Sequence, residues 1–210
     1  MNTIILMASG EGTNFSAMIR SGLRISLVIT DKSNAGIIKR AHDKGVECIC
    51  IPKNISETRE DHELRIIKTI PTDRPVDLII LAGYMKILSP VFLNNFPKII
   101  NIHPSLLPSF KGKNAIEDAY RFGCRYIGAT VHWVNEEMDG GKIIEQEGFR
   151  VDDGETLTEV IKKMHLLENA MYPRIVHQIT TQKQMGGLDI LMDMGLGGEH
   201  QIWKRSHNDG

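Results

Sequence analysis

Three polar residues in the middle of the chain, Asn101, His103 and Asp139, have side chains suited to acyl-group chemistry. An imidazole can donate a hydrogen bond or move a proton near neutral pH. A carboxylate can favour the cationic form of the imidazole, and an amide can donate to an oxygen that develops negative charge. Because no serine or cysteine has the context of a nucleophile elbow, we expect direct transfer or hydrolysis of an acyl group through a tetrahedral intermediate, not a covalent acyl-enzyme.

The positions of these residues indicate that they meet. Asn101 and His103 directly follow the apolar residues 99–100, and Asp139 lies in the segment 135–141 that joins two further candidate strands. Ligands of open α/β sheets bind beyond the carboxyl ends of the strands, so one crevice can collect all three side chains. The alternative is that His103 is a hydrogen-bonded core histidine and Asp139 a turn residue before two glycines.

A second candidate site is the loop Ser9-Gly-Glu-Gly-Thr-Asn14, which follows the apolar run 3–8 and precedes apolar residues at helical spacing. A strand, a glycine loop and a helix together present free backbone N–H groups to an anion. The loop has no lysine and matches neither the dinucleotide-binding glycine motif nor the Walker motif. Anion binding therefore stands beside a simpler interpretation, a tight turn that needs glycine for its backbone angles.

Two charged residues lie in predicted helices. Glu168 falls inside the apolar stripe of a long helix that begins with the capping box Thr156–Glu159. A carboxylate in such a stripe is either paired with another side chain or directed at a ligand. We expect Pro173 to kink or interrupt this helix. Arg59 lies in the first turn of another helix, where an ordinary solvated arginine is the alternative to a functional one.

The elements that must position these residues follow an α/β pattern. Apolar runs at 3–8, 25–30, 46–51 and 78–82 alternate with helical patterns. This alternation predicts a Rossmann-like, mainly parallel sheet with helices on both faces. The run at 78–82 is the most apolar of them, so we place it near the centre of the sheet.

The remaining elements complete one domain. The runs 127–134 and 142–149 alternate more strongly in polarity, so we expect antiparallel strands at the sheet edge. The helix expected over 58–70 should turn Leu64, Ile67 and Ile70 toward the core. Because glycines are frequent beyond Gln182 and the end is polar, we expect a single domain over 1–185 and a loosely ordered tail over 186–210.

The overall composition is that of an ordinary globular protein, with 210 residues, 24% charged and 41% hydrophobic, and a net charge of −1. This balance gives no reason to expect nucleic acid or a membrane as a partner, and no apolar segment approaches the roughly 20 residues of a membrane helix. The cysteines have no zinc-binding spacing, so we expect no metal. With no signal peptide, their odd count suits a cytoplasmic protein, for which we expect a monomer or weak homodimer.

Several segments make the chain resemble a known family. Asn101-Ile-His-Pro-Ser-Leu-Leu-Pro108 is similar to a block found across folate-dependent formyltransferases. The glycine loop together with Glu168-Asn-Ala-Met-Tyr-Pro173 narrows the resemblance to the phosphoribosylglycinamide formyltransferases of purine biosynthesis, over roughly residues 1 to 180. Further similar blocks are Leu81-Ala-Gly-Tyr-Met-Lys-Ile-Leu-Ser-Pro90, Gly128-Ala-Thr-Val-His132 and Met138-Asp-Gly-Gly141.

The resemblance implies a formyltransferase fold and an activity on small molecules. The formyl group of 10-formyltetrahydrofolate, a co-substrate, would pass to the amine of 5-phosphoribosylglycinamide. Asn101, His103 and Asp139 match the catalytic set. The residues implied in ribonucleotide binding are Gly12, Thr13, Asn14 and Glu168. The residues implied in folate binding are Arg59, Met85, Lys86, Ile87, Leu88, Asn101, Asn135, Glu136, Glu137, Met138 and Asp139.

One segment departs from the family pattern, and three alternative functions are weighed against the resemblance. The segment 111–117 lacks the histidine that many members carry there, so no substrate contact is carried over to it. A formyltetrahydrofolate deformylase would need an additional N-terminal domain, yet the first expected strand begins at Thr3. A methionyl-tRNA formyltransferase would need a further C-terminal domain and positive charge for tRNA. A non-catalytic folate or nucleotide binder would have no need of all three catalytic-type residues.

Overall fold

The computed structural model of the protein describes residues 2–73 and 75–182. Its strands are β1 (Ile4–Met7), β2 (Leu27–Thr30), β3 (Cys48–Cys50), β4 (Leu78–Leu81), β5 (Ile99–His103), β6 (Tyr126–Trp133) and β7 (Ile143–Arg150). Its helices are α1 (Thr13–Arg20), α2 (Gly36–Asp43), α3 (Arg59–Thr69), α4 (Pro90–Asn95), α5 (Ala115–Phe122) and α6 (Leu157–Gln182). The tail predicted over 186–210 and the domain boundary predicted at 185 lie outside the described residues.

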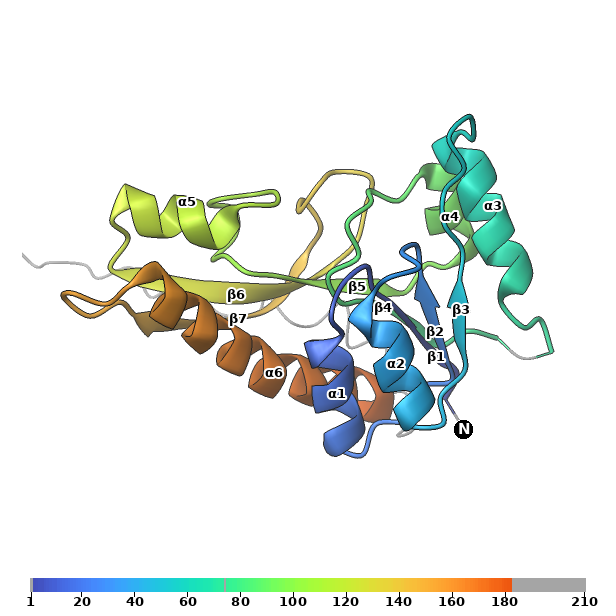
Figure 1. The fold of residues 1–210 in the computed structure, drawn as a ribbon, viewed down its shortest axis with the longest axis horizontal. Coiled ribbons are helices and arrows are strands. Elements are labelled where there is room, and N and C mark those ends of the chain that lie inside the picture. Colours follow the sequence, from blue (N-terminus) through green and yellow to red (C-terminus); the bar gives the residue numbers. More distant parts are fainter. Residues whose placement is uncertain (1, 74, 183–210) are drawn as a thin grey trace, which may run out of the picture.

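The strands form one sheet in the order β3-β2-β1-β4-β5-β6-β7 (Figure 1). Pairing is parallel from β3 through β5, and β6 and β7 are antiparallel additions. The predicted α/β sheet is confirmed, including the antiparallel edge and the central place of the strand from the 78–82 run. Among the described helices, none combines the length and hydropathy that a membrane span requires.

Helices cover both faces of the parallel part of the sheet, which explains the uninterrupted apolar strands. In β1, Ile4 and Leu6 pack into a core shared with α1, α2, α5 and α6. Ile5 and Met7 point to the other face and pack into a core shared with α3 and α4. Since successive side chains of a strand alternate between faces, a strand buried on both sides must be apolar throughout.

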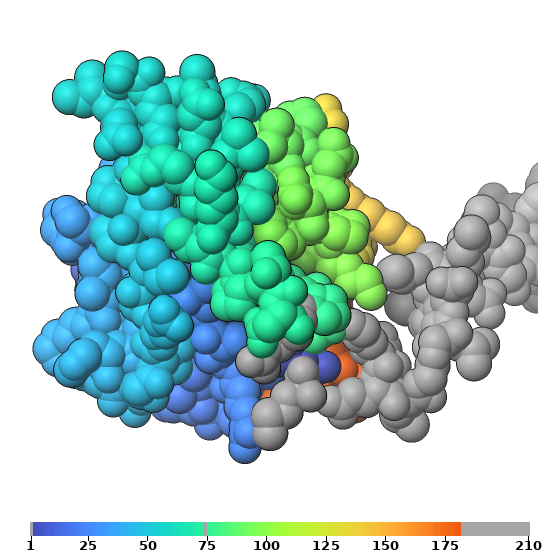
Figure 2. All heavy atoms as spheres, turned by 90° about the vertical axis from the view of Figure 1, so that its right-hand side faces the viewer, coloured from blue at the N-terminus to red at the C-terminus, as the bar shows by residue number. Residues whose placement is uncertain are grey.

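The buried face of α3 differs from the prediction. His62, Glu63 and Ile66 are buried, whereas Leu64 is 42% exposed and Ile67 only partly buried. Figure 2 shows α3 and its neighbouring residues in teal, packed directly on the green segment around α4. The prediction is confirmed for Ile70, which is buried in this core, and wrong for Leu64. Polar residues with buried partners lie at the interface instead: the His62 ring binds the carbonyl of Ile51 at 2.7 Å, and Glu63 binds Ser89 at the start of α4.

The long helix α6 begins as predicted but is not interrupted. Thr156 and Glu159 form the capping box, with the Thr156 N–H donating to Glu159 Oε2 at 2.8 Å. The helix continues through Pro173 to Gln182. Met171 and Tyr172 before the proline, and Ile175 and Val176 after it, are buried in the core. This packing holds the helix together where the proline removes a backbone hydrogen bond.

Tyr172 attaches α6 to the sheet beneath the carboxyl ends of its central strands. Its side chain is fully buried, and its hydroxyl lies 2.8 Å from the carbonyl oxygen of Leu81 in β4 and 3.1 Å from that of Ile100 in β5. The hydroxyl therefore donates to β4 and to β5, the strand that carries Asn101 and His103. Burial, with Glu168 adding to it, holds the pKa of Tyr172 well above its usual value, so the donor keeps its proton.

We expect Tyr172→Phe to lower the free energy of unfolding by about 1–2 kcal/mol, because two strand carbonyls lose a buried donor. Denaturant unfolding with the exposed Tyr126→Phe as control measures the difference. Equal stability of the two variants would contradict this attachment role.

Candidate active site

A cavity of about 250 Å³ opens beyond the carboxyl ends of β4 and β5. Its lining comes from within the segments 81–88, 101–104, 112–113 and 132–139. Parallel strands direct their carboxyl ends to one edge of the sheet, and the loops that follow them form the crevice. The cavity therefore lies where the sequence placed the three candidate catalytic residues.

The pairing of β5 with β6 builds the floor of this cavity. Asn101 and His103 are two residues apart on β5, so their side chains share one face of the sheet. The antiparallel register places His132 directly opposite Asn101. The Asn101 amide Nδ2 lies 3.3 Å from His132 Nε2, so this contact joins the two strands at the site.

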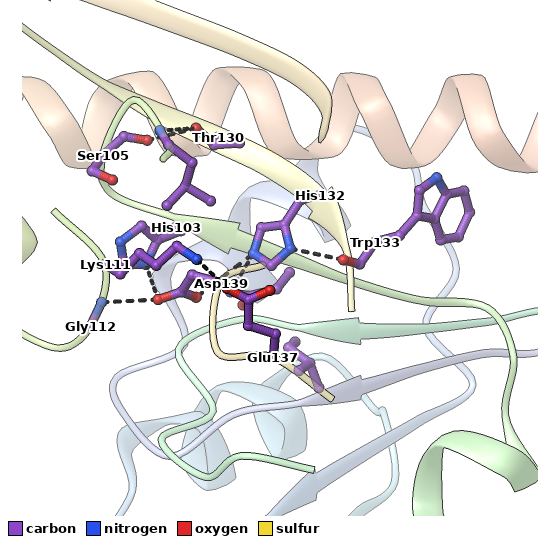
Figure 3. Close-up of polar contacts among 12 residues, drawn as sticks. His103, Ser105, Lys111, Gly112, Thr130, His132, Trp133, Glu137 and Asp139 are labelled. Carbon is purple, nitrogen blue, oxygen red and sulfur yellow. Dashed lines mark hydrogen bonds and ion pairs between the residues drawn. The ribbon is translucent and has the colours of Figure 1, made fainter. Parts of the chain in front are cut away.

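Asp139 comes from the turn between β6 and β7 and closes the site. Its carboxylate lies between the two histidine rings (Figure 3), with Oδ2 3.5 Å from His103 Nδ1 and Oδ1 3.8 Å from His132 Nε2. The backbone N–H of Gly112 donates to Oδ2 at 2.9 Å. Asp139 has a φ of +49° in the left-handed region, which aspartate tolerates better than most residues. Asn101, His103 and Asp139 are thus brought together.

His103 has an oxygen facing each ring nitrogen. Nε2 lies 2.9 Å from the carbonyl oxygen of Phe110. A carbonyl can only accept, so Nε2 carries a proton, while Nδ1 faces the Asp139 carboxylate. The ring is nearly buried, and both contacts fix its orientation.

His132 is neutral and orients the Asn101 amide. Burial is the largest cause that lowers the pKa of His132 from 6.5, and the Trp133 carbonyl and Asp139 offset it only in part. Nδ1 donates to the Trp133 carbonyl oxygen at 2.9 Å, which leaves Nε2 as an acceptor for one N–H of Asn101. The second N–H of this amide is free to bind an oxygen in the cavity.

The segments predicted to bind folate border the cavity on two sides. The lining includes Met85, Lys86, Ile87 and Leu88 on one side and Asn135, Glu137, Met138 and Asp139 on the other. Two predicted residues are not part of the lining. Glu136 is exposed in the turn, and Arg59 forms an ion pair with Glu60 at 3.1 Å at the start of α3. Lys111, next to the lining residue Gly112, binds Glu137 at 2.7 Å and so joins the two loops.

The glycine loop forms a separate site at the N-terminus of α1. Gly12 precedes the helix with a φ of +75°, and no side chain caps the helix. The N–H groups of Thr13, Asn14 and Phe15 donate to none of the described residues. Nearby, the buried Oδ1 of Asn14 also has no hydrogen-bond partner within the described chain. This end of α1 can therefore bind an anion through its backbone and the helix dipole.

Glu168 is buried on α6, which packs against α1. Burial raises the pKa of its carboxyl to about 7. Within residues 2–73 and 75–182, no side chain or backbone group forms a hydrogen bond or ion pair with it. Of the two interpretations that the sequence left open, structural pairing is therefore not observed. No group of three His, Cys, Asp or Glu side chains in the described residues is arranged to hold a metal ion.

Comparison with known proteins agrees with this geometry. The formyl transferase family model matches residues 2–176. The phosphoribosylglycinamide formyltransferase of Bacillus subtilis (strain 168) is 36% identical over 186 residues, which is 85% of this chain and 95% of that protein. The chain belongs to the phosphoribosylglycinamide formyltransferase family.

Two further relatives of this family support the assignment. The phosphoribosylglycinamide formyltransferase of Haemophilus influenzae is 37% identical over 188 residues, which is 86% of this chain and 88% of that protein. The crystal structure of phosphoribosylglycinamide formyltransferase from Bacillus halodurans matches with a TM-score of 0.82 at 32% identity, covering 87% of this chain and 97% of the other. The family resemblance and the fold class inferred from the sequence are both confirmed.

Sequence reasoning did not include His132 among the candidate site residues of this formyltransferase. A signal for it was present, because His132 alternates with Val131 and Trp133 in a run predicted to be an antiparallel strand. Only the register with β5 shows that the alternation places its ring against Asn101. A histidine on a strand has no recognisable partner until the neighbouring strand is known.

The pKa of Glu168 predicts a pH-dependent stability difference. Because the pKa rises from 4.5 to about 7, the folded chain holds a proton that the unfolded chain has lost, and stability from this group falls as pH rises through that range. The full effect is about 3 kcal/mol. Glu168→Gln keeps the shape and removes this titration. We therefore expect its free energy of unfolding, relative to the wild type, to increase between acidic pH and pH 8.

Denaturant unfolding of both proteins across this pH range provides the measurement. A difference that stays constant with pH would show that the Glu168 carboxyl has its ordinary pKa.

Gly12 should contribute to the stability of the fold, whatever it binds. A Cβ at this position would lie 2.4 Å from Cδ1 of Ile37 in α2, and its φ of +75° is unfavourable for other residues. We expect Gly12→Ala to lower the free energy of unfolding by about 1–3 kcal/mol. Gly10→Ala is the matched control, because nothing lies within 4 Å of its added Cβ. Similar melting temperatures for both variants would refute the close approach of Ile37.

Proposed function

We propose that the chain transfers the formyl group of 10-formyltetrahydrofolate to the amine of 5-phosphoribosylglycinamide, giving formyl-phosphoribosylglycinamide and tetrahydrofolate. The observation that carries this proposal is the cluster of Asn101, His103, His132 and Asp139 at the floor of the cavity. The relatives named above are formyltransferases acting on this ribonucleotide. Their names favour transfer over the hydrolysis carried out by a deformylase.

The residues of the cavity fit a folate. Leu81, Ile87, Leu88 and Met138 supply apolar surface for a flat ring. The N–H groups of Lys86, Ile87 and Leu88 donate to none of the described residues and so remain available for polar ring atoms. Asn135 to Asp139 face this segment across the cavity, and we propose that the two sides hold the ring between them. Arg59 and Glu136 remain proposed folate contacts outside the lining.

The free N–H groups at the start of α1 suit the phosphate of the ribonucleotide. We propose that Gly12, Thr13 and Asn14 bind it through backbone groups, since the helix dipole favours negative charge there. Glu168 has no partner among the described residues, and α6 packs beside α1. We propose that its carboxyl binds the hydroxyl groups of the ribose, which would supply the missing hydrogen bonds.

In the proposed reaction, the ribonucleotide amine attacks the formyl carbon held on N10, and a tetrahedral intermediate with a negatively charged oxygen forms. The N10–carbon bond then breaks, the folate nitrogen gains a proton and the amine loses one. The free N–H of Asn101, held in place by neutral His132, donates to the charged oxygen. His103 donates from Nε2, with this oxygen replacing the Phe110 carbonyl as acceptor. Asp139 stabilises the imidazolium and helps to accept the amine proton.

Substitutions in this set should lower turnover strongly. Loss of one oxyanion donor costs about 10²–10³ in turnover in other enzymes. We expect Asn101→Ala and His103→Ala each to lose roughly that factor in kcat, with smaller changes in either KM. Asp139→Asn should lose turnover and shift the pH profile, and its effect should not add to that of His103→Ala.

Steady-state formyl transfer, with free formate measured in parallel, tests the assignment. Near wild-type transfer by the His103→Ala variant would remove His103 from the mechanism. Release of formate by the wild type without ribonucleotide would favour the hydrolase.

Two further properties of the protein are its location and its oligomeric state. The substrates are small molecules, and we propose a monomer or weak homodimer in the cytoplasm, a location that the odd number of cysteines favours.

A further inference from the structure

Glu63 in α3 is buried at a point where the chain turns from the cavity rim into α4. It is 2% exposed, and both of its carboxylate oxygens are used. Oε1 accepts the backbone N–H of Ser89 at 2.9 Å, and Oε2 accepts the Ser89 hydroxyl in a short hydrogen bond. Ser89 is fully buried. The carboxylate is thus bound to a single residue through two donors.

These contacts differ from ordinary helix capping. Ser89 occupies the N-cap position of α4, where a serine oxygen commonly accepts an N–H from the first turn. Its side chain forms no such cap bond and donates to Glu63 instead. The pair therefore fixes the place of Ser89 itself. Loss of the Glu63 carboxylate would leave the buried N–H and the buried hydroxyl of Ser89 without acceptors. An unsatisfied buried donor costs more free energy than its hydrogen bond contributes.

Ser89 directly follows the segment Met85–Leu88 that borders the cavity, and the beginning of this segment is held in a similar way. The Met85 N–H donates to Ser9 Oγ at 3.1 Å, and Ser9 Oγ donates to Asp31 Oδ1 at 2.6 Å. Lys86 Nζ lies 3.4 Å from Asp31 Oδ2. A carboxylate from another part of the chain thus holds each end of the segment.

Between these two anchors, the segment has little structure of its own. It belongs to neither a helix nor a strand, and the Met85 side chain is 66% exposed. The N–H groups of Lys86, Ile87 and Leu88 have no acceptor among the described residues. The direction in which these groups point therefore depends on where the ends of the segment are held.

We propose that Glu63 is a positioning residue for folate binding, acting through Ser89 on the peptide groups of Lys86–Leu88. This inference rests on the proposed function, because it takes the ligand of the cavity to be a folate. Glu63 does not line the cavity, so its effect on the ligand is indirect. Its removal should affect folate binding and leave the ribonucleotide site at α1 unchanged.

The test compares Glu63→Ala, Glu63→Gln and Ser89→Ala with a control on the same helix. Ile66→Val is that control. Ile66 is fully buried in the core between α3 and the sheet, so its truncation lowers stability, but it leaves the hydrogen bonds between Glu63 and Ser89 intact. Calorimetry measures the binding of tetrahydrofolate, kinetics give kcat and both KM values, and hydrogen exchange reports on residues 84–90. Melting temperatures record the loss of stability in each variant.

We expect Glu63→Ala to weaken tetrahydrofolate binding and raise the folate KM by about tenfold or more, the loss typical of a hydrogen bond to a charged group. Ribonucleotide KM and saturated kcat should stay within about twofold. Glu63→Gln should remain near the wild type, since its amide can accept from the Ser89 N–H and donate to Oγ. Ile66→Val should lower the melting temperature without changing folate affinity.

If Glu63→Ala does not fold, Ser89→Ala carries the test, with an increase in folate KM of about threefold and faster exchange over 84–90. The inference is overturned if Ile66→Val weakens folate binding as much, or if folate and ribonucleotide KM rise together. The inference alone is overturned if the wild type binds tetrahydrofolate and transfers formyl groups while Glu63→Ala and Ser89→Ala both match it in folate affinity and folate KM. A wild type that fails to bind tetrahydrofolate overturns the proposed function together with this inference.

Discussion

The Asp139 carboxylate is the interaction on which the site depends. It meets His103 from β5, His132 from β6 and the Gly112 N–H, which come from separate segments of the chain. A mostly buried carboxylate is costly without a hydrogen-bond donor, and the Gly112 N–H supplies one here. The turn that carries Asp139 can close on β5 only because β6 and β7 extend the sheet in antiparallel order. Site and sheet edge are therefore parts of one arrangement.

The strand order explains why the two candidate ligand sites lie side by side. The chain proceeds from β1 outward to β3 and then returns to β4 on the other side of β1. This reversal creates a crevice at the carboxyl ends of the central strands. The glycine loop after β1 and the segment after β4 both begin there, joined by the Ser9 N–H donating to the Gly83 carbonyl at 3.1 Å. A group moving between two substrates needs such adjacent sites.

Buried carboxylates have two different uses in this structure. Asp31, Glu63 and Asp139 each accept hydrogen bonds that hold a loop or segment at the cavity. Glu168 is also buried, yet no described residue forms a hydrogen bond or ion pair with its carboxyl, and its pKa rises to about 7. A satisfied carboxylate stabilises the fold, whereas an unsatisfied one destabilises it at neutral pH. This contrast supports a ligand-binding role for Glu168 and structural roles for the others.

The sequence by itself determined the sheet, its antiparallel edge, the capped start of α6 and the catalytic candidates Asn101, His103 and Asp139, because apolar periodicity and capping are local properties. Tertiary structure alone decided what depends on distant partners. The register of β5 with β6 brought His132 to Asn101, and Ser89 drew Glu63 into the core in place of Leu64. Packing around Pro173 kept α6 continuous. In each case a residue distant in sequence supplied the hydrogen bond or the packing that overrode the local pattern.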